Sequence, residues 1–188
     1  MIDEKRFKLV DTKTGKEYEF DGLNGSIGPD VINISSLYKK TGLFTYDPGF
    51  TSTAACNSKI TYIDGEKGVL QYRGYPIEEL ANNSSHLEVC YLLMHGELPS
   101  ESDKNEFEEI IKNHTLLNEQ IIQFYKGFRR DAHPMAMMIG IVGALSSFYH
   151  DTLNIEDPEH RMIASHRILA KMPTIAAMAY KYSVGQPF

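Results

Sequence analysis

Two arginines, an aspartate and a histidine lie together just before a proline, at Arg129, Arg130, Asp131, His133 and Pro134. Such a group could transfer protons, or hold an anionic ligand through its arginines. A proline at the first helical position, however, leaves the next backbone N–H groups to be capped by a preceding side chain, and Asp131 can fill that role. We also favour a structural role for His133, because a helix N-terminus disfavours a charged imidazole.

A second cationic group is formed by Arg167 and Lys171, which are four positions apart on a predicted helix. Two cations on one helix face repel each other unless a carboxylate or another anion lies between them. His114 and Thr115 follow an earlier helix and could add hydrogen-bond donors, and Tyr149 ends the helix between the two. The residues alone leave a solvated face and a phosphate-binding site as alternatives, and they favour the solvated face.

Other chemical motifs fail on spacing. The segment "GLNGSIG" repeats glycine, but it lacks the preceding strand, the following helix and the trailing acid of a dinucleotide-binding loop. His160 and His166 are six positions apart and do not share a helix face, as two zinc ligands on one helix would. Cys56 and Cys90 are too far apart for a metal knuckle and too few for a disulfide framework. The residues therefore predict no metal site.

Small residues recur along the predicted helix 134–149, at Ala136, Gly140, Gly143, Ala144 and Ser147. Their spacings of three and four residues leave one helix face nearly free of side-chain bulk, so that another backbone can approach it. Packing within the chain and packing against a second subunit explain this pattern equally well.

The elements that position these residues change type along the chain. Residues 6–10 with 17–20, and residues 59–63 with 68–73, alternate as strands around glycine-containing turns and predict two β-hairpins. From Tyr75 onward the apolar period becomes helical, with Ser85 and Ser100 as N-caps. Each predicted break between helices contains a proline or a glycine, including Pro173 near the C-terminal end.

Composition narrows the function further. The 188 residues are 42% hydrophobic and carry a formal net charge of −6, which supports a globular core but not the binding of nucleic acid phosphates. The N-terminus mixes acids and bases and does not resemble an export signal. The longest apolar run, residues 134–149, is shorter than the ~20 residues that cross a bilayer. We therefore expect a cytoplasmic protein that does not bind membranes.

Several segments, in order and with few gaps, resemble the N-terminal portion of a bacterial type II citrate synthase. They are "FTYDPGFTSTAACNSKITYIDGEKGVLQYRGYPIEELA", "LEVCYLLMHGELP", "FRRDAHPMAMM", "FYHD" and "LAKMPTIAAMAYKYSVGQPF". The resemblance implies a mainly α fold with a small N-terminal β region, an incomplete citrate synthase-like large domain. Residues 1–74 would form the β-rich region with two hairpins and residues 75–188 the first helices of the large domain, with its remainder and the small domain absent.

The resemblance also implies an activity of the tricarboxylic acid cycle. Citrate synthases are acyltransferases that condense acetyl-CoA with oxaloacetate and water to give citrate and CoA, without a cofactor. Their catalytic histidines and aspartate belong to motifs, including an Ala-His-Gly-Gly segment, that have no match in this sequence. The resemblance thus assigns no catalytic residue here and predicts a truncated sequence that is inactive alone. The alternative is a standalone helical binding and assembly module with a nucleotide site.

Regulation and assembly are implied in the same way. The family forms dimers, and type II members often form hexamers inhibited by NADH. Helices 134–149 and 158–184 would carry the self-association. The positions that match the NADH site are His114, Thr115, Tyr149, Arg167 and Lys171. Responsive members carry an arginine and a methionine where this chain has Asn113 and Leu116, which removes one cation.

Overall fold

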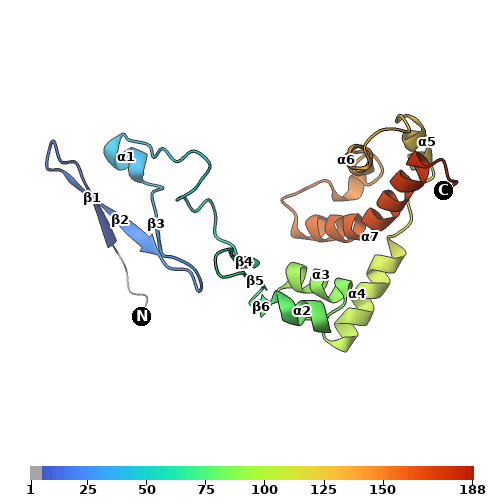
Figure 1. The fold of residues 1–188 in the computed structure, drawn as a ribbon, viewed down its shortest axis with the longest axis horizontal. Helices are drawn as coiled ribbons and strands as arrows, with labels where there is room; N and C mark the ends of the chain where they lie inside the picture. Colours follow the sequence, from blue (N-terminus) through green and yellow to red (C-terminus); the bar gives the residue numbers. More distant parts are fainter. Residues whose placement is uncertain (1–5) are drawn as a thin grey trace. The chain divides into compact units, whose positions relative to one another are not determined.

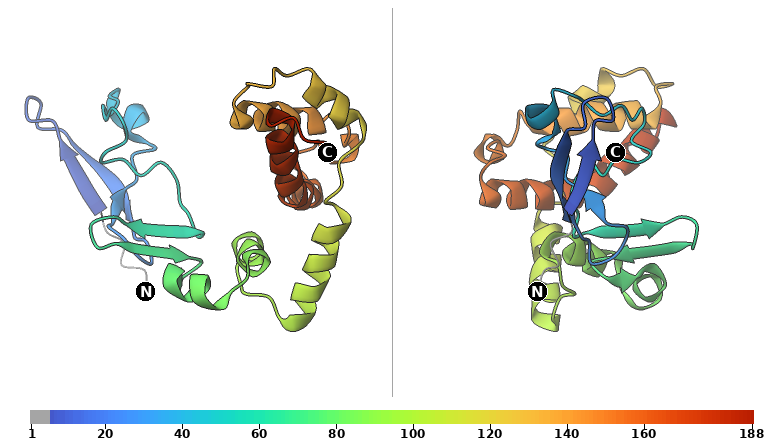
Figure 2. Two further views of the ribbon diagram at one scale, coloured as in Figure 1. Left: turned by 45° about the vertical axis from the view of Figure 1, so that its right-hand side comes forward. Right: turned by 90° about the vertical axis from the view of Figure 1, so that its left-hand side faces the viewer.

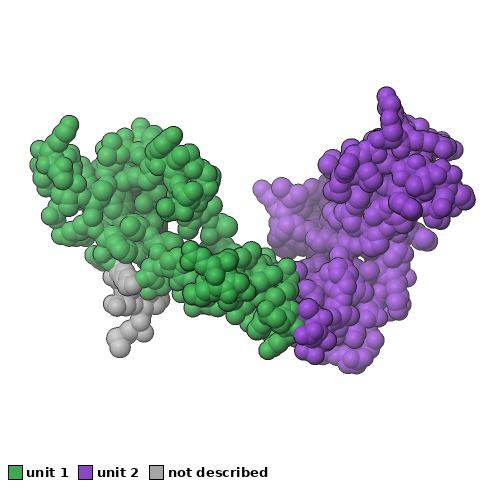
Figure 3. Space-filling view, in the orientation of Figure 1, with its two compact units in different colours: residues 1–79 green, residues 80–188 purple. Residues whose placement is uncertain are grey.

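The computed structural model describes residues 6–188, and the chain divides into two compact units. One unit extends to Glu79 and the other runs from Leu80 to Phe188, as Figure 3 shows in two colours. The division falls inside a helix, a few residues after the boundary at 74/75 that the sequence predicts.

The first unit contains two small antiparallel sheets (Figure 1). Their strands are β1 (Arg6–Val10), β2 (Glu17–Leu23) and β3 (Val31–Ile32) in one sheet, and β4 (Thr61–Asp64), β5 (Val69–Tyr72) and β6 (Tyr75–Pro76) in the other. The tight turn between β1 and β2 uses Gly15 at a φ of 70°, which glycine adopts without steric cost. A short helix, α1 (Leu37–Thr41), buries Leu37.

The second unit is helical, and it contains all five candidate site residues predicted from the sequence. Its helices are α2 (Ile77–Asn83), which begins in the first unit, α3 (His86–His95), α4 (Glu101–Asn113), α5 (Gln120–Lys126), α6 (Pro134–Leu145), the 3₁₀ helix η1 (His150–Thr152) and α7 (Pro158–Ser183). The long α7 packs against α6 and α4, and Figure 2 shows this arrangement from two further sides. The predicted class, mainly helical with a small strand region, is confirmed.

Helix starts follow the predicted capping in two cases and depart from it in a third. Ser85 and Ser100 each cap their helix in a reciprocal capping box, with Glu88 and Asp103 as partners. At α6 the cap is His133, whose Nδ1 accepts from the backbone N–H of Met135 over 3.2 Å. The prediction of Asp131 as this cap is wrong, because its carboxylate is paired with Arg129.

Two predicted helix ends also change. The helix expected over 134–149 ends at Leu145, where the hydroxyls of Ser146 and Ser147 donate to the carbonyls of Gly143 and Ala144 and turn the chain. The break expected at Pro173 is absent from α7, which runs continuously through this residue. A proline costs the helix one backbone hydrogen bond, and the packing of the flanking turns against α4 and α6 stabilises the helix across it.

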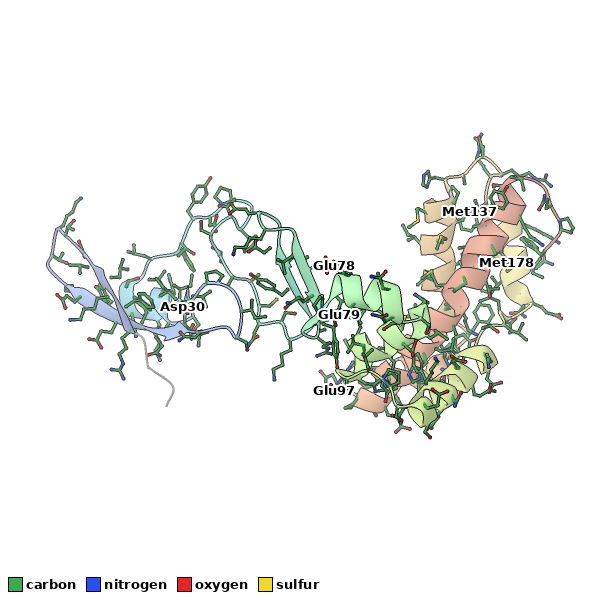
Figure 4. The ribbon with its side chains drawn as sticks, turned by 60° about the horizontal axis from the view of Figure 1, so that its bottom comes forward. Asp30, Glu78, Glu79, Glu97, Met137 and Met178 are labelled. Atoms are coloured by element: carbon green, nitrogen blue, oxygen red, sulfur yellow. The ribbon has the colours of Figure 1, made fainter. Side chains whose placement is uncertain are left out.

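The main core of the second unit lies between α5, α6 and α7. Its fully buried side chains include Ile121, Tyr125, Met137, Ile141 and Ile175. The Tyr125 hydroxyl donates to the Ile175 carbonyl over 2.8 Å, which satisfies the only polar atom of that side chain. Figure 4 marks Met137 on α6, which belongs to this core, and Met178 on α7, which is partly buried and packs against it. Among the described residues, no helix is long and apolar enough to cross a membrane.

Candidate functional site

Lys171 is the most deeply buried cation of the candidate site, with 2% of its surface exposed. Its ammonium group donates to the backbone carbonyls of His114, over 2.6 Å, and Leu116, over 2.7 Å. One turn later, the Thr174 hydroxyl donates to the carbonyl of Thr115 over 3.0 Å. Side chains of α7 therefore bind three consecutive carbonyls, those of residues 114–116, at the start of the segment that follows α4.

Tyr149 brings the two predicted cations together. The guanidinium carbon of Arg167 lies 4.6 Å from the centre of its ring, and the Lys171 nitrogen lies 5.2 Å from it. The negative face of an aromatic ring attracts cations, so Tyr149 offsets part of their mutual repulsion. All five residues predicted from the sequence thus meet at one place in the second unit, where α4, the segment before η1 and α7 converge.

The structure also supplies the anion that the sequence argument required. Both carboxylate oxygens of Asp151 accept from Arg167 at 2.8 Å, and the Thr152 hydroxyl oxygen accepts from the same guanidinium at 3.0 Å. Hydrogen bonding to Arg167 holds the pKa of the Asp151 carboxyl below its ordinary value, and the same bond raises the pKa of Arg167. The Asp151 side chain is 62% exposed and that of Arg167 only 16%.

Asp151 and Thr152 were missed by the sequence argument. Asp151 ends the segment "FYHD", 16 residues before Arg167, and no helical spacing connects the two positions. Only the turn after α6 brings the carboxylate back to α7. The sole signal in the sequence was the need for an acid near two cations on one helix face.

His114 and Thr115 are already hydrogen-bonded to α4 itself. His114 Nδ1 lies 2.7 Å from the carbonyl oxygen of Ile110, and the Thr115 hydroxyl donates to that of Lys112 over 2.9 Å. These bonds satisfy carbonyls at the end of the helix. An added anion at this cluster would compete with Asp151 for Arg167, and two backbone carbonyls already accept from Lys171.

The arginines before α6 do not join this cluster. Arg129 forms a bidentate ion pair with Asp131, at 2.9 and 2.7 Å. Arg130 lies over the ring of Tyr182, 6.0 Å from its centre, and lines a hollow of about 410 Å³. The hydrogen bond from Arg129 lowers the pKa of Asp131, so this aspartate is a weak base and unsuited to proton abstraction.

Comparison with known protein families decides the relationship. Residues 49–188 match the family described as citrate synthase, C-terminal domain. The chain belongs to the citrate synthase family. Solved structures agree with this assignment. The citrate synthase of Thermotoga maritima MSB8 is 29% identical with a TM-score of 0.63, and the match covers 76% of this chain and 36% of that chain. The citrate synthase of Pyrobaculum aerophilum is 29% identical with a TM-score of 0.65, and the match covers 95% of this chain and 41% of that chain.

A third citrate synthase, from Thermoplasma acidophilum, has the same fold. It is 23% identical with a TM-score of 0.66, and the match covers 72% of this chain and 35% of the other. Its structure is a ternary complex with carboxymethyl coenzyme A and oxaloacetate. This citrate synthase-family chain therefore spans 35% to 41% of the length of the solved relatives it matches. The predicted citrate synthase-like fold is confirmed.

Proposed function

We propose that the intact polypeptide containing these residues is a citrate synthase, an acyltransferase that condenses acetyl-CoA with oxaloacetate and water to give citrate and CoA. The family match over residues 49–188 carries this proposal. The relative in complex with a coenzyme A analogue and oxaloacetate supports the two substrates. The reaction belongs to the tricarboxylic acid cycle, and the motifs in the sequence favour a bacterial type II enzyme in the cytoplasm.

In this proposal the 188 residues build the scaffold and not the catalytic centre. The chain covers 36% and 41% of two solved relatives, and no position in it matches the family's histidine and aspartate motifs. We therefore propose that the sequence is truncated, and that residues 1–188 alone do not catalyse the condensation.

An assay of CoA release tests the activity. Thiol release by the intact native polypeptide should require both acetyl-CoA and oxaloacetate, and residues 1–188 produced alone should release none above the blank. Absence of release by the intact polypeptide, or release that does not depend on oxaloacetate, would reject the proposal.

We also propose that α6 and α7 mediate self-association, as a dimer or a hexamer. Each presents apolar side chains to solvent: Ile139 on α6 is 70% exposed, and Tyr180 on α7 is 62% exposed. Such side chains on neighbouring helices favour a protein partner, and a symmetric oligomer places the same surface on both subunits.

A regulatory site is proposed at the cluster of His114, Thr115, Tyr149, Arg167 and Lys171, with NADH as its ligand. The convergence of these five residues supports it. Because Asp151 is paired with Arg167, a phosphate must displace an exposed carboxylate. Lys171 already donates to two backbone carbonyls, so its contribution is chiefly long-range attraction. We expect weak, salt-sensitive binding.

Titration of the intact polypeptide with NADH tests this site. Arg167→Ala should abolish the binding, whereas Arg129→Ala should not, although Arg129 also pairs with an aspartate through two hydrogen bonds. Equal binding by both variants would place the ligand elsewhere. A standalone nucleotide-binding module is the second candidate function, favoured by the location of the whole cluster in one unit. NADH binding without condensation activity would select it.

A further inference from the structure

Three histidines from three helices gather where α3, α4 and α7 meet. His95 lies in the last turn of α3, His114 caps the C-terminus of α4, and His166 lies on α7. The ring of Phe107, on α4, is shared between two of them. It makes an edge contact with His166 at 5.5 Å between ring centres and another with His95 at 6.3 Å.

His166 has an apolar setting and an unpaired nitrogen. Phe107 is 4% exposed and Ala170 is 3% exposed, and both belong to a small core with Ile111. Within residues 6–188, the buried Nε2 atom of His166 has no hydrogen-bond partner. A neutral imidazole tolerates this setting, because one of its two nitrogens carries no proton. A protonated imidazole has two N–H donors, and one of them would remain unpaired in this apolar contact.

Burial and two neighbouring histidines oppose a positive charge on His166. α3 contributes His95, which stacks on Tyr91 at 4.1 Å. α4 contributes His114 and also the acid Asp103. Hydrogen bonding to Ser100 is the main cause that lowers the pKa of Asp103, and the charge of His95 adds to it. On α7, Arg167 is paired with Asp151 and Lys171 with backbone carbonyls. Across the described chain, no ion pair joins a carboxylate to His95, His114 or His166.

We propose that this histidine junction is an acid-sensitive contact: protonation of His166 separates α4 and the segment 113–117 from α7. The apolar Phe107 contact is the part that breaks, and the hydrogen bonds from Lys171 to the same segment weaken with it. The device would couple mild acidification to the loosening of one helix pair while the α5–α6–α7 core stays closed.

The direction of the pH effect follows from the state of His166. Burial, and then the charges of His95 and His114, lower its pKa from the ordinary value of 6.5. A depressed pKa in the closed state means that the open state binds the proton more tightly. The contact is therefore fully stable above pH 6.5 and loses stability as the pH falls below that value. Each unit of pKa difference multiplies the opening equilibrium about tenfold.

Hydrogen exchange of the intact native polypeptide at pH 7.5 and 5.5, corrected for intrinsic exchange rates, tests the proposal. Amides of α4 and of residues 113–117 should open severalfold more at the lower pH. His166→Phe keeps a ring against Phe107 but cannot be protonated, so it should remove this response. His86→Phe makes the same change at an exposed histidine on α3 and should retain it.

Two results would overturn the proposal. One is wild-type exchange at α4 that does not change with pH, and the other is a His166→Phe protein with the full wild-type response. If His166→Phe does not fold, His95→Gln provides a second measurement. Removing one of the two opposing charges should shrink the response, and an unchanged response would also reject the proposal.

Discussion

The ammonium group of Lys171 donates to the backbone carbonyl of His114 over 2.6 Å, across 57 residues of sequence. A buried lysine usually pairs with a carboxylate, but this one lies at the C-terminal end of α4, where unpaired carbonyls give the helix its negative pole. Lys171 therefore acts as a tertiary C-cap. The position predicted as a ligand-binding cation also holds two segments of the chain together.

Replacing Lys171 by methionine should destabilise this junction. The aliphatic stem is retained, but the carbonyls of His114 and Leu116 lose their donor, which costs about 2 kcal/mol. Native-state hydrogen exchange should show faster opening of residues 113–117. Lys112→Met, at an exposed lysine paired with Glu109, should change the opening free energy by less than about 0.5 kcal/mol. Equal effects of the two substitutions would contradict the capping role.

Removing the Asp151 carboxylate should strengthen anion binding at Arg167. In the wild type a phosphate must replace the Asp151 carboxylate at Arg167, and in Asp151→Ala this competitor is absent. The dissociation constant for NADH should therefore fall severalfold. Isothermal titration calorimetry of the intact polypeptide measures this. Asp131→Ala, which frees Arg129 in the same way, should leave the constant unchanged. A weaker complex with Asp151→Ala would show that the carboxylate supports the site instead of blocking it.

Two glycines of α6 should respond differently to leucine. A Cβ at Gly143 would meet nothing within 4 Å, whereas one at Gly140 would lie 2.7 Å from the ring of Phe128. Gly140→Leu should therefore overpack the second unit, reduce its free energy of unfolding by about 1–3 kcal/mol and lower its melting temperature. Gly143→Leu should leave the fold intact and weaken self-association, seen as a lower mass in analytical ultracentrifugation. An unchanged oligomer would remove α6 from the interface.

The loop after α1 should depend on Asp47. Its carboxylate accepts from the backbone N–H groups of Thr51 and Ser52 and from the hydroxyls of Thr51 and Thr53. These bonds, chiefly that from Thr53, lower its pKa from 3.8 to about 2. The stabilisation is present above pH 3.8 and is lost as the pH falls through about 2.

Asp47→Ala should therefore make residues 47–53 more sensitive to protease at neutral pH. Glu66→Ala, in the exposed turn between β4 and β5, is the matched control and should leave cleavage of this loop unchanged. Protection equal to that of the wild type in Asp47→Ala would mean that other contacts order the loop.

Local structure was largely predictable because its causes lie within a few residues. Ser85 and Ser100 cap their helices through backbone N–H groups three positions later, and Gly15 forms its turn through its own φ. The same locality limits such predictions. Asp131 is a reasonable cap by spacing, yet Arg129 takes its carboxylate and His133 caps α6.

What the sequence by itself determined was the family, through its ordered segments, and the two cations of the candidate site, through their helical spacing. Only the tertiary structure decided what those cations do. The turn after α6 brings Asp151 to Arg167 from 16 residues away, and the packing of α4 on α7 brings the carbonyl of His114 to Lys171 from 57 residues away. A lysine exposed to water and a lysine bonded to a distant carbonyl are the same residue in the sequence, and only the long-range contact distinguishes them.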